Sequence, residues 1–365
     1  MAAKKFFAVF LTVIVGAISI IAAANYYFDY YGVFHINHVR IYSNTLNDRF
    51  VKMKYLLLND NFQKYDSYLW GSSRVMKMNS RLTGQKTYNL SVPAGMTEDY
   101  LQQLRLLLKN GAEMKTIYIG LDDFSYCRSN ASVRKNSSWI LYQDNICRDM
   151  ETYSRYLLTP SILKRVKEDS SQKKNMVLLD QGVTYIPEGI EKKIENCPGE
   201  YVASKKFTEP TVFESDSEEF TKCIENLKAI KILCKEHNME MKVFFMPHHV
   251  TTYFNDDMEM MNRFKKKLVK ISPFWDFSGI NYVTSNNYFW YETSHPRAFI
   301  CDKILDKVSG QNQITWVPDF GVYVTEENVD AFCEKAVRDR EAYDPNHEQW
   351  IPSAEERMVM TKRLN

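Results

Sequence analysis

Short apolar runs recur along the chain from residue 66 onward, and they indicate buried strands. They lie at residues 68–70, 87–90, 116–121, 241–246 and 274–277, of which the last is expected to be the final strand. Between them, apolar residues recur at helical spacing over residues 97–109, 217–237 and 257–270. Strands that alternate with helices predict an α/β domain with a mostly parallel sheet covered on both faces. Ligands are then expected beyond the carboxyl ends of the strands.

The strongest hydrophobic segment lies near the start of the chain. Residues 6–24 carry no charge, Lys4 and Lys5 precede them, and a tyrosine-rich stretch follows. This length spans a bilayer core, and the lysines favour a cytoplasmic N-terminus with the rest of the chain outside. The alanines at 22–24 also suit a signal peptidase, so a cleaved signal peptide is the alternative. We favour the uncleaved anchor because the run exceeds the usual apolar core of a signal peptide, roughly 7–15 residues.

The chain divides into four predicted parts. Residues 1–28 form a cytoplasmic tip and a transmembrane anchor, and residues 29–65 form a linker that leads into a helix. Residues 66–310 form the α/β domain, with an insertion at about 125–210 that is rich in Ser, Lys and Asn, and residues 311–365 form a C-terminal extension. No later segment matches the first in apolar length, so a multi-spanning protein is excluded.

Composition narrows the classes of partner. The chain has 365 residues, 45% of them hydrophobic, and a net charge of +2 with both signs mixed along the sequence, so nucleic acid is not expected. Its 23 tyrosines suit either a large core or a carbohydrate-stacking surface. Seven cysteines lack zinc-site spacing, and we expect neither a metal nor a cofactor. The odd count leaves at least one thiol unpaired within the chain, and Cys127 with Cys147 is one pair that could form.

Two short motifs fall at expected strand ends. Gly71-Ser72-Ser73-Arg74 follows the first strand, where glycine permits a sharp turn that can lift a serine to the rim of the sheet. Glu292 and His295 are three residues apart, directly before a helical segment. At this spacing a carboxylate can fix the tautomer of a general-base histidine. Each motif alone is also common in ordinary turns and helix caps.

Together, and in this order, the motifs resemble the SGNH (GDSL-like) hydrolase superfamily. The resemblance is to its membrane-anchored envelope branch, which includes alginate O-acetyltransferases and the D-alanyl-lipoteichoic acid transfer protein. It implies a three-layer α/β/α sandwich of the flavodoxin-like type. It also implies that Ser73 is the nucleophile, with Ser72 as the second choice, and that His295 is the general base. Glu292 stands where the family has aspartate.

The resemblance covers the oxyanion hole only in part. The family's second block supplies a glycine amide, and Gly95 is the matching residue. With the Ser73 amide, it would stabilise the tetrahedral oxyanion. The third block normally carries an asparagine after a strand, but this chain has Asp122 and Asp123 there. One donor of the family is therefore missing or comes from another residue.

Other polar residues at strand ends are candidates for substrate contacts. Arg74 could hold an anionic substrate group or form a salt bridge to a neighbouring helix. Asp122 and Asp123 follow a central strand, and His248 and His249 follow the next one. The two histidines could contact substrate, belong to a polar loop or bind a metal, although no zinc-type spacing supports a metal.

The resemblance and the export signal together predict serine-dependent acyl transfer or ester hydrolysis on a glycan or polymer of the bacterial cell envelope. The domain would lie outside the cell membrane, in the periplasm or on the exterior. Its partners would be the membrane, the polymer and a multi-spanning membrane protein that supplies acyl groups. The alternative is a non-catalytic SGNH-like scaffold or glycan-binding protein of an envelope polysaccharide assembly, which Glu292 and the missing asparagine favour.

Overall fold

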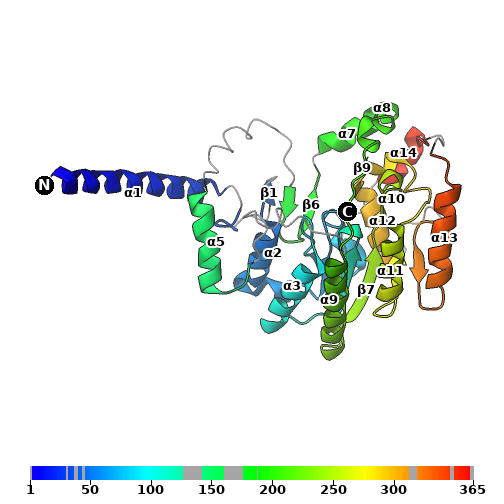
Figure 1. The fold of residues 1–365 in the computed structure, drawn as a ribbon, viewed down its shortest axis with the longest axis horizontal. Coiled ribbons are helices and arrows are strands. Elements are labelled where there is room, and N and C mark those ends of the chain that lie inside the picture. The colour runs from blue at the N-terminus through cyan, green and yellow to red at the C-terminus, as the bar shows by residue number, and fades with distance from the viewer. Residues whose placement is uncertain are drawn as a thin grey trace.

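A six-stranded sheet forms the centre of the protein (Figure 1). The structure, a computed structural model, describes residues 2–29, 32–36, 40–42, 46–125, 142–159, 176–186, 188–311, 319–345 and 349–361. The order of the strands is β11 (Val322–Val324), β8 (Phe274–Asp276), β7 (Glu240–Phe245), β4 (Thr116–Leu121), β2 (Ser67–Trp70) and β3 (Thr87–Asn89). Neighbouring strands are parallel except β11, which pairs with β8 in the antiparallel sense. The predicted α/β fold with a mostly parallel sheet is confirmed.

The order in which successive strands are added to the sheet reverses at β2. From β2 it moves outward to β3 and then crosses back to β4, β7 and β8 on the other side. In open α/β sheets such a switch point leaves a crevice beyond the carboxyl ends of the two central strands, and ligands bind there. The crevice expected in this protein lies beyond the ends of β2 and β4.

Both faces of the sheet are buried. Strand residues alternate between two hydrophobic clusters, so Tyr68 and Trp70 join one cluster while Leu69 joins the other. The first cluster contains side chains of α2 (Asp48–Leu57), α3 (Thr97–Lys109), α9 (Ser217–Glu236) and α11 (Met258–Leu268), and the second contains those of α12 (Ala298–Ser309). This two-sided burial explains why the strands are nearly continuous apolar runs.

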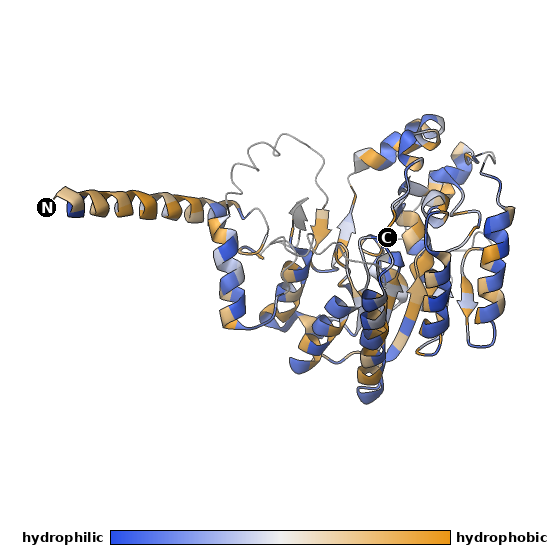
Figure 2. Ribbon diagram, viewed as in Figure 1, coloured by the Kyte–Doolittle hydropathy of each residue, from blue (hydrophilic) through white to orange (hydrophobic). Residues whose placement is uncertain are grey.

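The N-terminal helix α1 (Ala2–Phe28) projects away from the domain (Figure 1). It is long and apolar enough to cross a membrane, and its apolar window is not covered by protein. Figure 2 shows that most residues of this helix are hydrophobic. At its end, Asn25 donates to the carbonyl of Leu157, which lies 2.7 Å away at the end of α5 (Ile146–Leu158). These features are those of a single-pass membrane anchor.

The predicted insertion contains regular structure of its own. Strands β5 (Met176–Leu178) and β6 (Val183–Tyr185) pair with each other, and β5 also pairs with β1 (Arg40–Tyr42). Helices α7 (Glu188–Asn196) and α8 (Pro198–Val202) follow. The six described cysteines form no disulfide with one another, and Cys127, a member of the pair considered above, lies outside the described residues.

The C-terminal extension corrects one prediction. Residues 274–277 are not the final strand, because β11 adds a further strand at the edge of the sheet. Val322 and Tyr323 are 43% and 46% exposed, so this short strand lacks the buried apolar run that identifies central strands. Helices α13 (Val329–Ala342) and α14 (Ala354–Thr361) complete the described chain.

Candidate active site

Four loops meet beyond the carboxyl end of the sheet. Ser73 follows β2, Asp122 follows β4 and His248 follows β7. The fourth loop joins the short strands β9 (Trp290–Glu292) and β10 (His295–Pro296), which pair so that His295 lies opposite Glu292. The fold thereby brings the two sequence motifs to the switch point between β2 and β4.

Ser73, His295 and Glu292 form a continuous chain of hydrogen bonds. The Oγ of Ser73 lies 2.8 Å from Nε2 of His295, although the residues are 222 positions apart in sequence. On the other side of the ring, Nδ1 of His295 bonds to Oε1 of Glu292. The second carboxylate oxygen of Glu292 accepts from the backbone N–H of Ser294 at 2.8 Å, which fixes the orientation of the acid. The arrangement has the connectivity of a serine–histidine–acid triad.

The charges around His295 favour the neutral imidazole. Burial and the nearby ammonium of Lys77 lower the pKa of His295 below its ordinary value, and they outweigh the opposing effect of Glu292. Burial alone would raise the pKa of Glu292, but its bonds to His295 and the Ser294 amide lower that pKa, so the acid is ionised. The ionised carboxylate of Glu292 accepts a hydrogen bond from the N–H at Nδ1 of His295. The lone pair of Nε2 is then left to accept the Ser73 hydroxyl proton.

Two glycines allow the turn that carries Ser73 to pack tightly. A Cβ at Gly71 would lie 2.3 Å from a methyl group of Val75, and a Cβ at Gly95 would lie 2.4 Å from the Gly71 carbonyl oxygen. The Gly71 carbonyl also accepts from the N–H of Val92 at 3.1 Å. The turn after β2 and the loop after β3 therefore touch through their backbones. A side chain at Gly95 would separate them, and one at Gly71 would displace Val75 within its own turn.

Of the two backbone amides expected to bind an oxyanion, only one is without an acceptor in the part of the chain that the structure describes. Within the described residues, no acceptor pairs with the backbone N–H of Ser73. The N–H of Gly95, in contrast, already donates to the Val92 carbonyl at 3.0 Å inside its own loop. Only the Ser73 amide is thus placed as a donor in this conformation, and the role expected for Gly95 is not supported by its geometry.

Arg74 is a buried clamp between loops. Its side chain is 3% exposed, and its Nη1 pairs with Asp122 at 3.2 Å and with Asp123. Its Nε donates to the backbone carbonyl of Ser294 at 2.8 Å. The guanidinium therefore joins the nucleophile turn to the end of β4 and to the loop of His295. Of the two interpretations of Arg74, the structure gives the salt bridge, and its partners are Asp122, which follows β4, and Asp123, the first residue of the short 3-10 helix Asp123–Ser125.

The two adjacent serines differ in their partners. Ser72 is 4% exposed and donates to Oδ2 of Asp122 at 2.5 Å, whereas Ser73 is partly exposed and faces His295. Asp122 and Asp123 are 1% and 2% exposed and are bonded to protein groups. Their side chains are not presented to a substrate. Of the two serines, the geometry favours Ser73 as the nucleophile.

His248 belongs to the same buried ionic cluster. Its Nδ1 lies 2.5 Å from Asp256, and its Nε2 lies 3.6 Å from Asp123. Burial alone would lower the pKa of His248, but Asp123 and Asp256 outweigh it and raise that pKa. These three residues could by spacing surround a cation. The Arg74 guanidinium already occupies the Asp123 carboxylate, so we interpret the group as an ion-pair cluster.

His249 caps a short helix. Its Nδ1 accepts the N–H of Thr251 at 3.2 Å at the start of α10 (Val250–Tyr253), and its Nε2 bonds to Asn287 at 2.8 Å. Burial lowers the pKa of His249 to about 4. The ring is 1% exposed, so the structure gives this histidine a local capping role rather than a contact with substrate.

The end of the insertion packs against the triad loop. Tyr201 of α8 donates to the carbonyl of Trp290 at 2.6 Å, and Thr293 donates to the carbonyl of Glu209 at 2.7 Å. Behind the loop, Arg297 is fully buried and pairs with Glu191 and Glu195 of α7. No sequence motif indicated these contacts, because none of them belongs to a local pattern.

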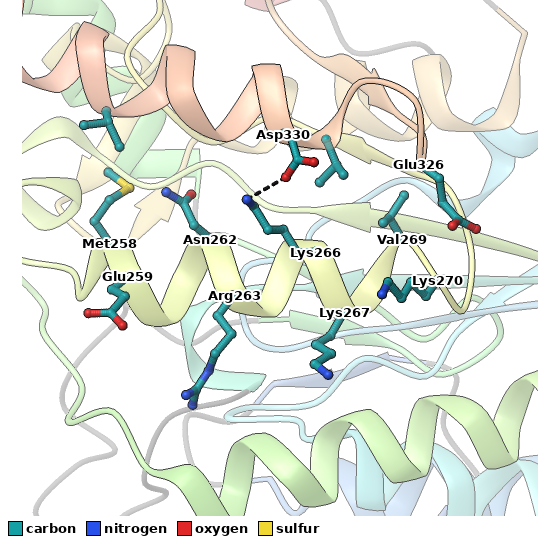
Figure 3. A pocket seen from close by; sticks show the side chains of 12 residues that line it. Met258, Glu259, Asn262, Arg263, Lys266, Lys267, Val269, Lys270, Glu326 and Asp330 are labelled. Atoms are coloured by element: carbon teal, nitrogen blue, oxygen red, sulfur yellow. Dashed lines mark ion pairs between the residues drawn. The ribbon is translucent and has the colours of Figure 1, made fainter.

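A separate cavity of about 810 Å³ lies between α11 and the segment from β11 to α13. Its lining carries both signs of charge, and Lys266 pairs with Asp330 at 2.6 Å across it (Figure 3). Arg263 and Lys267 point away from that pair. The lining includes no member of the serine–histidine–acid chain, and its mixed charge identifies no ligand.

The sequence was compared with models of known protein families and with characterised proteins, and neither comparison gives a match. The class of this site therefore rests on its geometry.

Proposed function

We propose that the protein is an extracytoplasmic serine-dependent acyltransferase or esterase of the SGNH type. The observation that carries the proposal is the hydrogen-bond chain from Ser73 through His295 to Glu292, set at the switch point of a parallel sheet. The strand order, with helices contributing to clusters on both faces, also agrees with the three-layer sandwich that the resemblance implies.

The proposed reaction has two steps. Oγ of Ser73 attacks the carbonyl carbon of an ester while Nε2 of His295 takes the hydroxyl proton, and the Ser73 amide bonds to the oxyanion. Collapse of the intermediate expels the alcohol, which receives the proton from His295. A water molecule or an acceptor hydroxyl then attacks the acyl-serine with His295 again as base. This step releases an acid or a new ester and restores Ser73.

The substrate class follows from the anchor as well as the site. A single apolar helix at the N-terminus, with lysines at its start, supports a domain held outside the cell membrane. Esters on a glycan or polymer of the cell envelope would then be within reach. A multi-spanning membrane protein would be a suitable source of acyl groups. This position also predicts that removal of α1 leaves the chemistry intact but separates it from such a partner.

The test is labelling of the full-length chain, in detergent, with a fluorophosphonate probe. The probe reacts with activated serines, so we expect labelling of the wild type and of Ser72→Ala but none of Ser73→Ala. Circular dichroism of each variant checks that the fold is retained. Equal labelling of wild type and Ser73→Ala, or no labelling of folded wild type, would refute the proposal.

A non-catalytic scaffold is the second candidate, and two observations favour it. The strand that should end in the family's asparagine ends before Asp122 and Asp123, and both are enclosed in ion pairs with Arg74. The Gly95 amide is also engaged within its own loop. If folded wild type is not labelled, this candidate takes precedence, and the protein would then bind an envelope polymer without modifying it.

A further inference from the structure

Two aromatic rings and two ammonium groups form a connected row of contacts that begins next to the triad. Tyr291 directly precedes the acid of the triad, and Nζ of Lys77 lies 5.5 Å from the centre of its ring. Tyr201 joins the row because its hydroxyl donates to the backbone carbonyls of Trp290 and Tyr291, at 2.6 and 3.2 Å. Nζ of Lys206 lies 3.4 Å from the centre of the Tyr201 ring. The contacts therefore run from the triad loop to Lys206 without a break.

Solvent reaches every member of this row. Lys77, Tyr201, Lys206 and Tyr291 are all partly exposed, as Ser73 and the other two triad residues are. A substrate whose ester lies at Ser73 could thus contact the row with another part of the same molecule.

Lys206 is a cation of the row that has no acidic partner within ion-pair distance among the described residues. The other strong cations near the triad loop are committed, since Arg74 pairs with two aspartates and Arg297 pairs with two glutamates. No described carboxylate lies within ion-pair distance of Lys206. Partial burial lowers its pKa to about 8, so it is still mostly protonated at neutral pH. A half-buried cation held on an aromatic ring offers its remaining N–H donors to an anion.

We propose that Lys206 and Lys77, with the rings of Tyr201 and Tyr291, form a subsite for an anionic oxygen group, a carboxylate or a phosphate, on the ester substrate. The inference rests on the proposed function, because the subsite is defined relative to Ser73. In this proposal Lys206 and Lys77 take the role for which Arg74 was the sequence-based candidate, since Arg74 is buried in ion pairs with Asp122 and Asp123. The substrate class thereby narrows to esters of acidic molecules or polymers.

The kinetic test uses two esters with related leaving groups and the full-length chain in detergent. One is neutral, 2-nitrophenyl acetate, and the other carries a carboxylate, 3-acetoxy-4-nitrobenzoate. Wild type should prefer the anionic ester, and Lys206→Met should lower the ratio of the two kcat/KM values about ten-fold, the effect of one charged hydrogen bond. Lys205→Met removes an exposed ammonium next to it and is the matched control, for which the ratio should not change. An unchanged ratio in Lys206→Met would overturn the subsite.

A binding test separates the subsite from the chemistry. Benzoate and inorganic phosphate are titrated in separate arms into the full-length Ser73→Ala protein, and binding is followed by NMR. We expect saturable binding of at least one anion, weakened about ten-fold by Lys206→Met and not by Lys205→Met. The arm that binds more tightly identifies the preferred group. Binding of neither anion, or equal binding to both lysine variants, overturns the subsite even if the serine proves active. Binding without any serine reactivity would retain the subsite and reject the enzyme.

Discussion

Two histidine–acid pairs lie at the same end of the sheet, and they differ in exposure and in charge. The side chain of His295 is 31% exposed, and its ring lies between Ser73 and one carboxylate. His248 is 1% exposed, and its ring lies between the carboxylates of Asp123 and Asp256. Both have the acid–imidazole contact that a search for catalytic groups would seek, but only the first is open to a substrate.

The pKa values of the two rings are shifted in opposite directions. The pKa of His248 is raised because two carboxylates outweigh its burial, and this favours the protonated form of the ring. The pKa of His295 is lowered because burial and Lys77 outweigh one carboxylate, so this ring is neutral and can accept a proton. An acid beside a histidine therefore does not identify a general base. Whether the imidazole is neutral and can act as a base depends on its burial and on all the charges around the ring.

The largest effect on activity is expected from removing the side chain of His295. His295→Ala should lower the hydrolysis of 2-nitrophenyl acetate by roughly 10⁴-fold, because Ser73 then has no base. Initial rates measured on the full-length chain give the value. His237→Ala, which removes an exposed histidine at the end of α9, is the control and should retain full activity. A His295→Ala variant that keeps more than about a tenth of the rate would contradict the role of general base.

Removing the guanidinium of Arg74 should mainly lower the free energy of unfolding. Arg74→Met removes the arginine partner of the buried Asp122 and Asp123, and breaking a buried pair costs about 3–5 kcal/mol of unfolding free energy. Chemical denaturation of the full-length chain measures this loss. Arg105→Met on the exposed face of α3 is the matched control. A loss below about 1 kcal/mol would mean that the cluster does not depend on its arginine.

Changing the acid should have a smaller effect on the rate. Glu292→Gln keeps the size of the side chain, but its amide can donate to Nδ1 and favour the wrong tautomer of His295. We expect a loss of about 10²-fold in kcat/KM, which corresponds to about 2.7 kcal/mol. Glu200→Gln, on an exposed part of α8, is the control. An unchanged rate would show that Glu292 does not orient His295 in the reaction.

The smallest effect is expected in the pH profile. Activity requires neutral His295, so kcat/KM should rise with pH through the pKa of that residue, which lies below its usual value. Lys77→Met removes a positive charge that lowers this pKa, so the acidic limb should move to higher pH by about half a unit. Lys205→Met should leave the limb in place. A shift to lower pH in Lys77→Met would contradict the sign of this interaction.

Local periodicity was sufficient for most of the central elements. The helix predicted at residues 97–109 and the strand predicted at 116–121 have the same bounds in the structure, since the helix buries a regular apolar face and the strand is buried along its whole length. The edge strand β11 was missed because two of its three residues are substantially exposed. A strand at an edge owes its position to backbone pairing, and backbone pairing leaves no hydrophobic signature.

The candidate site was predictable only in its outline. The order of the two motifs indicated Ser73, His295 and Glu292, and the structure brings these side chains together, while their catalytic roles stay predictions. The environment of Arg74 and the hydrogen bond of the Gly95 amide could not be inferred, because both depend on loops distant in sequence. A motif specifies which groups are present, and their partners are fixed only when the loops meet.

The short strand β11 has a consequence for solubility. It occupies the edge of β8, whose N–H and C=O groups would otherwise face solvent, and its three residues offer little length for another chain to add to. Unprotected edges of this kind allow sheets from separate molecules to join. The C-terminal extension thus covers this edge of β8, and we expect it to hinder self-association. Shortened versions of the protein that stop before Val322 should precipitate or form fibres even where the rest of the fold survives.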